Sequence, residues 1–191
     1  MSGLELHPGA GPVVDSVPAG LVIVGNLEIT VTEAGDGELG LVAGILEEAS
    51  RWLESRGIPA WPQPFPVEWI RGGMLVGTCY IAWDGAAPVG TFTLQWTDPA
   101  FWGERPGEGP DRARYLHRLA VRRSYKGLGR ALVDLAEELT RRSGATCLRL
   151  DCLATDPGIR AYYEAAGFEY RGDVDVIRRE PWRASLYEKQ M

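Results

Sequence analysis

Hydrophobic positions along this chain follow two different periods from Leu27 onward. Alternation of apolar and polar residues is typical of a strand with one buried face, and apolar spacing of three to four residues is typical of an amphipathic helix. The alternating pattern predicts strands at 27–32, 78–83, 88–96, 114–121, 146–153, 168–176 and 183–188. The helical spacing predicts helices at 38–55, 67–71, 128–142 and 158–166.

Turn and cap residues separate these elements. Asp84-Gly85 predicts a hairpin, Gly144 ends helix 128–142, and Asp156-Pro157 is a typical helix start. Segments 61–66 and 99–111 are rich in proline or glycine, which predicts irregular loops. Three consecutive strands in the middle of the order favour an α/β fold with a mixed sheet flanked by helices. We expect an N-terminal arm without regular structure over 1–25 and one domain over 26–191.

Length and composition agree with one globular domain. The chain has 191 residues, of which 45% are hydrophobic and 24% charged, so wholesale disorder is excluded. Its longest apolar run, 21–24, is far shorter than the roughly 18 residues of a membrane span. No basic segment precedes that run, so we expect neither a signal peptide nor a membrane anchor.

The chain has three cysteines, Cys79, Cys147 and Cys152. An odd number without close spacing predicts reduced thiols and a cytoplasmic protein. All three fall in predicted strands, which favours buried inert thiols over a covalent acyl-enzyme. No group of His, Cys and carboxylate residues has the spacing of metal ligands, so we predict no metal site.

Charge is unevenly distributed. The net charge of −6 argues against nucleic acid or an anionic membrane as a partner. Residues 112–130 nevertheless contain seven basic residues and no acidic one: Arg112, Arg114, Arg118, Arg122, Arg123, Lys126 and Arg130. Such a segment in an acidic chain predicts a local polyanion site, the alternative being a solvated basic face.

Gly127-Leu128-Gly129 opens helix 128–142 within this basic segment, a short loop after predicted strand 114–121. Glycine lets backbone N–H groups approach a ligand closely, and a helix N-terminus favours phosphate. A Walker P-loop is excluded because its Gly-Lys-Ser/Thr ending is absent. A dinucleotide fingerprint remains a rival, because Asp151 follows about 20 residues on, although Leu132 occupies its third glycine position. Plain turn chemistry is the structural alternative.

From Tyr115 to Phe168 the chain resembles the GNAT superfamily of acyl-CoA-dependent N-acetyltransferases. The resemblance rests on Leu119-Ala120-Val121, Gly127-Leu128-Gly129-Arg130-Ala131-Leu132, Asp156 and Ala161-Tyr162-Tyr163-Glu164-Ala165-Ala166-Gly167-Phe168. It implies a mostly antiparallel sheet with one splayed parallel pair, acetyl-CoA as co-substrate, and direct acetyl transfer to an amine in a ternary complex. Ser124 and a glycine turn shorter than the family's usual form leave open a second class, a catalytically weak acyl-CoA-binding or regulatory module.

The same resemblance implies roles for individual residues. Cofactor binding falls to Leu119, Ala120, Val121, Arg122, Lys126, Gly127, Leu128, Gly129, Arg130, Asp156 and Arg160. Tyr163 lies four residues before Gly167, where many family members have a tyrosine that protonates the leaving thiolate. Its structural alternative is an aromatic residue of the core.

His117 stands in a His-x-Leu-Ala-Val segment similar to that of the arylalkylamine N-acetyltransferase branch. There a histidine on this strand helps to take the amine proton through water, and an imidazole suits that task. Strand alternation predicts that His117 points to the same side as Leu119 and Val121. Asp151 or water alone are the alternative bases, and a structural histidine is the alternative role.

Seven tryptophans are many for this length, and three of them suggest an aromatic wall for the acceptor: Trp52, Trp61 and Trp96. Cation–π contacts and the acidic balance outside 112–130 favour a small cationic amine. A polyamine, an antibiotic amine, an amino-acid derivative and a peptide N-terminus all remain open, and so does core packing for these side chains. We expect a monomer or homodimer.

Overall fold

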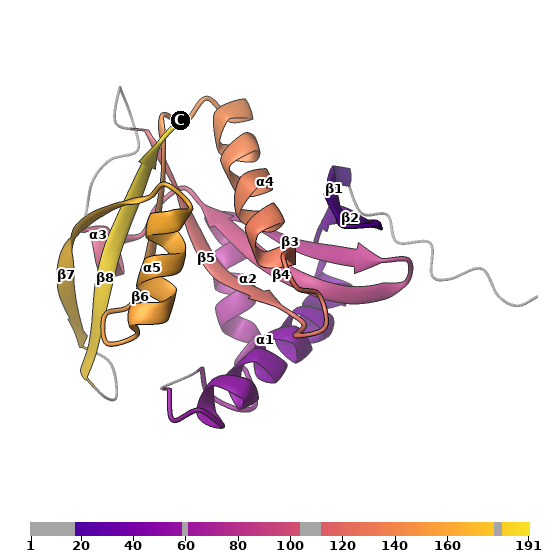
Figure 1. Ribbon diagram of the computed structural model, residues 1–191, viewed down its shortest axis with the longest axis horizontal. Coiled ribbons are helices and arrows are strands. Elements are labelled where there is room, and N and C mark those ends of the chain that lie inside the picture. Colours follow the sequence, from indigo (N-terminus) through magenta and orange to yellow (C-terminus); the bar gives the residue numbers. More distant parts are fainter. Residues whose placement is uncertain (1–17, 59–60, 104–111, 178–180) are drawn as a thin grey trace, which may run out of the picture.

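The computed structural model describes residues 18–58, 61–103, 112–177 and 181–191 (Figure 1). Its centre is an eight-stranded sheet in the order β1-β2-β3-β4-β5-β6-β8-β7. The strands are β1 (Pro18–Val24), β2 (Leu27–Glu33), β3 (Gly77–Asp84), β4 (Ala87–Gln95), β5 (Ala113–Val121), β6 (Cys147–Leu153), β7 (Glu169–Ile177) and β8 (Pro181–Gln190). Every pair of neighbours is antiparallel except β5 and β6, which are parallel. The predicted mixed sheet is therefore confirmed.

Helices cover both faces of this sheet (Figure 1). They are α1 (Leu39–Glu54), α2 (Val67–Leu75), α3 (Pro99–Trp102), α4 (Leu128–Arg142) and α5 (Pro157–Ala165), with a short 3-10 turn at Asp36–Glu38. Helices α4 and α5 pack on one face, and α1 and α2 pack on the other. We call these the α4 face and the α1 face. No helix in the described part of the chain is long and apolar enough to cross a bilayer.

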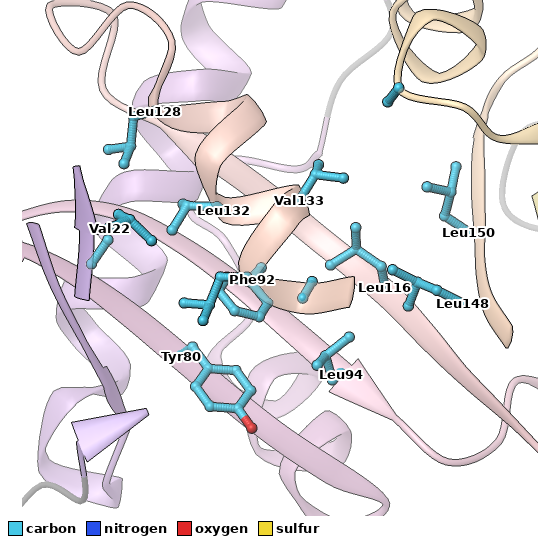
Figure 2. Close-up of a cluster of buried hydrophobic side chains, with 14 of the residues drawn as sticks. Val22, Tyr80, Phe92, Leu94, Leu116, Leu128, Leu132, Val133, Leu148 and Leu150 are labelled. Atoms are coloured by element: carbon cyan, nitrogen blue, oxygen red, sulfur yellow. The ribbon is translucent and has the colours of Figure 1, made fainter. Parts of the chain in front are cut away.

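The core on the α4 face is the larger one (Figure 2). Leu132 of α4 is fully buried against the sheet, together with Phe92 of β4 and Leu148 of β6. The helical spacing that predicted α4 thus corresponds to its buried stripe. The three cysteines are buried thiols, and burial raises the pKa of Cys152 to about 12, so this thiol stays protonated and inert as predicted.

Two segments differ from the prediction. Residues 18–24, expected in an irregular arm, form β1, an edge strand that a turn at Gly25 connects to β2. The apolar–polar alternation typical of a strand is not visible in this part of the sequence, because the outward-facing residues are apolar too. Leu21 and Ile23 are each 58% exposed, while Val22 between them is buried. Within the predicted loop 99–111, the first four residues form α3. Residues 1–17 and 104–111 lie outside the described residues, so those parts of the two predictions remain untested.

The parallel pair separates halfway along its length. Strands β5 and β6 are paired only from Ala113–Leu116 to Cys147–Leu150. Beyond that, β5 stays paired with β4 to Val121 and β6 stays paired with β8 to Leu153. We call the diverging segments, 117–121 and 151–153, the β5–β6 split. This is the splayed parallel pair that the resemblance implied.

A bulge in β5 lies at the start of this split. Thr91 is opposite Ala120 and Thr93 is opposite His117, so two β5 residues face Phe92 alone. One of them, Arg118, has a φ of +53°, which is unusual for a residue with a side chain.

The bulge corrects one prediction about side-chain direction. Leu119 and Val121 pack on the α4 face, as does Leu116, the residue before His117. Because adjacent strand residues point to opposite faces, His117 is directed to the α1 face. The expectation that His117 shares a side with Leu119 and Val121 is wrong, since the extra residue shifts the alternation by one.

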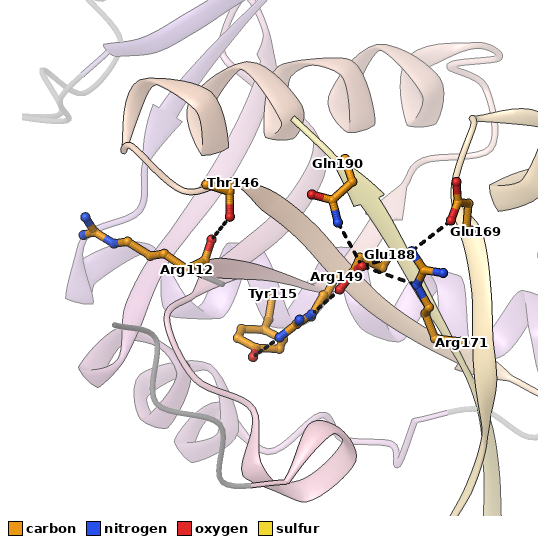
Figure 3. A network of polar contacts seen from close by, with 8 residues as sticks. All are labelled: Arg112, Tyr115, Thr146, Arg149, Glu169, Arg171, Glu188 and Gln190. Atoms are coloured by element: carbon orange, nitrogen blue, oxygen red, sulfur yellow. Dashed lines mark hydrogen bonds and ion pairs between the residues drawn. The ribbon is translucent and has the colours of Figure 1, made fainter. Parts of the chain in front are cut away.

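A buried polar network holds the paired end of the split together (Figure 3). Arg149 Nε donates to Glu188 Oε2 at 2.7 Å, and Arg149 Nη1 donates to the Tyr115 hydroxyl at 3.1 Å. Burial alone would raise the pKa of Glu188, but Arg149 and the neighbouring Arg171 hold it below its usual range. The network connects β5, β6, β7 and β8 directly beside the point where β5 and β6 part.

Asp156 begins α5 as its sequence predicts. Its Oδ1 accepts hydrogen bonds from the N–H groups of Gly158 at 2.9 Å and Ile159 at 3.3 Å. Asp156→Ala should therefore lower stability by about 1 kcal/mol, which is roughly 2–4 °C in Tm for a chain of this size. Thermal unfolding followed by circular dichroism measures the change. Asp175→Ala, at an exposed aspartate of β7, is the control, and equal Tm values for the two variants would contradict the capping role.

Candidate active site

His117 and Asp151 are the first residues of the β5–β6 split on their two strands. The Nδ1 atom of His117 lies 3.7 Å from Oδ1 of Asp151. Leu150 and Cys152 pack on the α4 face, so Asp151 points to the α1 face, as His117 does. The separation of the strands thus brings an imidazole and a carboxylate together at the point where backbone pairing ends.

A second carboxylate completes the group. Asp98 precedes α3 in the connection from β4 to β5, and its Oδ2 lies 3.5 Å from Nε2 of His117. The exposed fractions of the side chains are 6% for Asp98, 15% for His117 and 14% for Asp151. We call these three residues the His117 cluster. The cluster combines one proton acceptor, the imidazole, with two carboxylates in a site that is largely shielded from water.

Three potential metal ligands are thereby brought within 4.8 Å of one another, although the sequence spacing predicted no such group. The two carboxylates face opposite nitrogens of the ring. This geometry also suits a histidine that exchanges protons with a carboxylate on either side.

The glycine turn lies at the far end of β5 from the cluster. Gly127 has a φ of +87°, which favours glycine, and α4 begins at the next residue. A Cβ on Gly129 would lie 3.4 Å from the Tyr162 hydroxyl oxygen of α5. The helix N-terminus therefore presents backbone N–H groups and a partial positive charge where the split opens, which suits a phosphate.

Most cations of the basic segment 112–130 contact other side chains of the protein, although Arg112, Arg123 and Arg130 are exposed. Arg122 bonds to Glu48 and to the carbonyl oxygen of Pro88, both at 2.7 Å, and Arg130 pairs with Asp134 at 2.9 Å. Arg112 and Arg114 stack on Trp96, and Arg123 stacks on Trp52. For Lys126, which is exposed, the described residues give no ion pair or ring contact. At least five of the seven cations therefore have partners within the described part of the protein.

Asp156 and Arg160, also predicted to bind cofactor, have contacts within the fold. Asp156 caps α5. Arg160 Nε donates to the Tyr187 hydroxyl at 3.3 Å, and its guanidinium lies over the ring of Tyr170. A cofactor role for these two residues stays a prediction.

Tyr163 lies in the core of the α4 face, in edge contact with Phe168 and close to Tyr187. Burial raises the pKa of its phenol, and the nearby ionisable groups Tyr162, Cys152 and Asp151 raise it further. Tyr163 therefore keeps its proton at any physiological pH. Tyr162, for which no role was predicted, is the tyrosine whose hydroxyl lies close to the glycine turn.

The three predicted acceptor tryptophans have separate surroundings. Trp52 is stacked by Arg123 with 3.9 Å between guanidinium carbon and ring centre, and Trp61 contacts Phe65 edge-on. The guanidinium groups of Arg112 and Arg114 lie over the ring of Trp96. This tryptophan also borders a shallow hollow of about 370 Å³ at the end of α2. No ring contact joins any two of these three described residues. The cation–π contacts of Trp52 and Trp96 are thus made with arginines of the protein itself.

Asp98 was missed because its local sequence, Thr97-Asp98-Pro99, has the form of a helix start inside an apparent loop. The same three residue types precede α5, where the aspartate does cap the helix. Nothing in the local pattern connects Asp98 to His117. The two residues come together only in the tertiary structure.

Comparisons with known proteins show the family of this chain. Residues 45–168 match the family described as Acetyltransferase (GNAT) family. The uncharacterized N-acetyltransferase YesJ of Bacillus subtilis (strain 168) is 28% identical over 141 residues, which cover 69% of this chain and 76% of that protein. The chain therefore belongs to the GNAT family of acetyltransferases, enzymes that take their acetyl group from acetyl-CoA.

Solved structures show the same fold. A GNAT-family acetyltransferase from Listeria monocytogenes 4b F2365 superposes with a TM-score of 0.73 at 24% identity, covering 90% of this chain and 100% of that one. The ribosomal L7/L12 alpha-N-protein acetyltransferase RimL, in a complex with coenzyme A, has a TM-score of 0.62 at 13% identity. That match covers 90% of this chain and 98% of RimL.

Proposed function

We propose that this chain transfers an acetyl group from acetyl-CoA to the primary amine of a small cationic acceptor, by direct attack in a ternary complex. The observation that carries the proposal is the His117 cluster at the start of the β5–β6 split. An acetyl group lying in the split would be next to a proton acceptor on the α1 face. It would also be near a protonated phenol, that of Tyr163, on the α4 face.

The cofactor would lie along the diverging strands. Its pyrophosphate binds at the turn of Lys126, Gly127 and Gly129, where the N-terminus of α4 favours negative charge. Its pantetheine arm follows residues 119–121, whose partner strand β6 has moved away. Backbone N–H groups that face the split polarise the acetyl carbonyl, because charge develops on that oxygen during attack.

The chemical step then needs two proton transfers. The amine nitrogen bonds to the carbonyl carbon, and the carbon–sulfur bond breaks to release the CoA thiolate. His117 takes the amine proton, directly or through water, and Tyr163 gives its proton to the thiolate. Both groups return to their starting state by exchange with solvent before the next turnover.

Charge favours a cationic acceptor. Two carboxylates beside one imidazole attract an ammonium group, and the acidic balance of the chain adds to this attraction. A protein N-terminus is the second candidate acceptor, since RimL, which shares the fold, is an alpha-N-protein acetyltransferase. A diamine and a peptide with a neutral side chain next to its N-terminus distinguish the two acceptors.

Thermal unfolding with saturating ligands is the first test. At 100 times Kd, acetyl-CoA and CoA should each raise Tm by roughly 5–10 °C, whereas NAD should have no effect. Thiol release with an amine panel then measures turnover. Stabilisation by acetyl-CoA without thiol release from any amine would favour the acyl-CoA-binding module instead. No stabilisation by either CoA species would contradict the acetyl-CoA site.

A further inference from the structure

Two aspartates of this chain share one local sequence and have different surroundings. Thr97-Asp98-Pro99 leads into α3, which begins at Pro99, and Thr155-Asp156-Pro157 leads into α5, which begins at Pro157. Aspartate followed by proline is a favoured helix start, because the carboxylate accepts from free N–H groups and proline fits the first turn. The Asp156 side chain accepts two such hydrogen bonds, whereas Asp98 makes no capping hydrogen bond to α3.

The carboxylate of Asp98 is directed to His117 instead. Its Oδ2 lies 3.5 Å from Nε2 of His117, and only 6% of its side chain is exposed. Loss of a helix cap lowers the free energy of unfolding by about 1 kcal/mol. Burial of a carboxylate lowers it by more, unless the carboxylate is hydrogen-bonded or paired. The imidazole of His117 is a partner that the fold gives to this carboxylate.

Asp98 and Asp151 are not equivalent neighbours of the ring. Asp98 faces Nε2 and is the more buried of the two, whereas Asp151 faces Nδ1 at the start of the β5–β6 split. A neutral imidazole has one N–H group, so only one carboxylate can accept from it at a time. The nitrogen without the hydrogen is the one that can take a proton from a substrate.

We propose that Asp98 is a positioning residue that keeps the hydrogen of neutral His117 on Nε2, so that Nδ1 is free to accept the amine proton. This inference rests on the proposed role of His117 as base. When His117 becomes an imidazolium, Asp98 balances the new charge on the buried side of the ring. A carboxylate that acts through a histidine in this way fixes the tautomer and the ring orientation.

The tautomer can be measured without any turnover. The chain has two histidines, so His7→Gln leaves His117 as the sole source of imidazole signals in a protein labelled with ¹⁵N-histidine. In this background we expect Nε2–H for the neutral ring. Asp98→Asn removes the charge with little change of shape, and the hydrogen should move to Nδ1, facing the carboxylate of Asp151. Nδ1–H before the substitution, or an unchanged tautomer after it, would overturn the inference.

Asp156→Asn is the matched control, because it alters the second Thr-Asp-Pro segment. Because asparagine caps a helix about as well as aspartate, Tm should stay nearly unchanged, and the tautomer of His117 should also stay unchanged. A tautomer change in this variant as well would show a general loosening of the fold and would count against a specific role for Asp98.

Kinetics supply a second readout if the proposed reaction is correct. Asp98→Asn should lower kcat by about 10- to 100-fold with KM for acetyl-CoA nearly unchanged, as expected for loss of a residue that orients another. The acidic limb of its pH–rate profile should move to lower pH, since of the two carboxylates that face His117 only Asp151 would remain charged. In a His117→Ala background the same substitution should have no further effect. An additive loss there would mean that Asp98 acts independently of His117.

Discussion

Replacing Tyr163 with phenylalanine should lower kcat by about 10²- to 10⁴-fold, the range for loss of one acid–base group. The substitution removes only the hydroxyl that, in the proposed mechanism, protonates the leaving thiolate. The ring contacts with Phe168 and Tyr187 remain, so the core keeps its packing. Steady-state thiol release measures kcat, and titration calorimetry with CoA should give a Kd close to that of the unmodified chain.

The pH dependence strengthens this test. Because burial raises the pKa of Tyr163, its folded form keeps the proton well above the usual range of a phenol, and deprotonation of this group should not limit kcat on the alkaline side up to about pH 10. Tyr170→Phe is the matched control, since that hydroxyl is on β7 and bonds to Asp173 at 2.9 Å. An unchanged kcat in Tyr163→Phe would exclude its role as acid and leave it an aromatic residue of the core.

His117→Ala should also lower kcat/KM by about 10²- to 10⁴-fold. The loss should be largest near neutral pH and smaller at high pH, where a greater share of the acceptor amine is already deprotonated. The acidic limb that belongs to His117 should disappear from the pH–rate profile. His7→Ala is the control for removal of a histidine as such.

The same measurement distinguishes the alternative bases. If the acidic limb persists unshifted in His117→Ala, then His117 is not the base, and Asp151→Asn becomes the informative variant. If Asp151→Asn raises KM for a cationic amine but leaves KM for acetyl-CoA unchanged, then Asp151 holds the ammonium group. Equal losses for cationic and neutral amines would contradict that role for Asp151.

Local patterns in the sequence were sufficient for most of the fold. Helix α4 was predicted at its observed bounds because its apolar stripe and the glycines at its two ends are all local signals. Strands β3 to β6 and the cap at Asp156 followed for the same reason. The glycine turn and the segment around Tyr163 also carried the family resemblance, since a motif is itself a local pattern.

The tertiary structure determined which side chains are neighbours in space. Seven cations stand in one segment of the sequence, but most of them are paired or stacked with side chains from distant parts of the chain, such as Glu48 and Trp52. The direction of His117 depended on a bulge, which shifts strand alternation by one residue and leaves no clear mark in the pattern.

The His117 cluster was the least predictable part. Asp98 and Asp156 have the same neighbours in sequence, yet one carboxylate caps a helix and the other faces an imidazole. That difference depends on the path of the chain through α3 and on the separation of β5 from β6, both of which are set by packing between distant segments. Local patterning therefore specified the elements and the family, whereas long-range packing specified the groups that meet in the site.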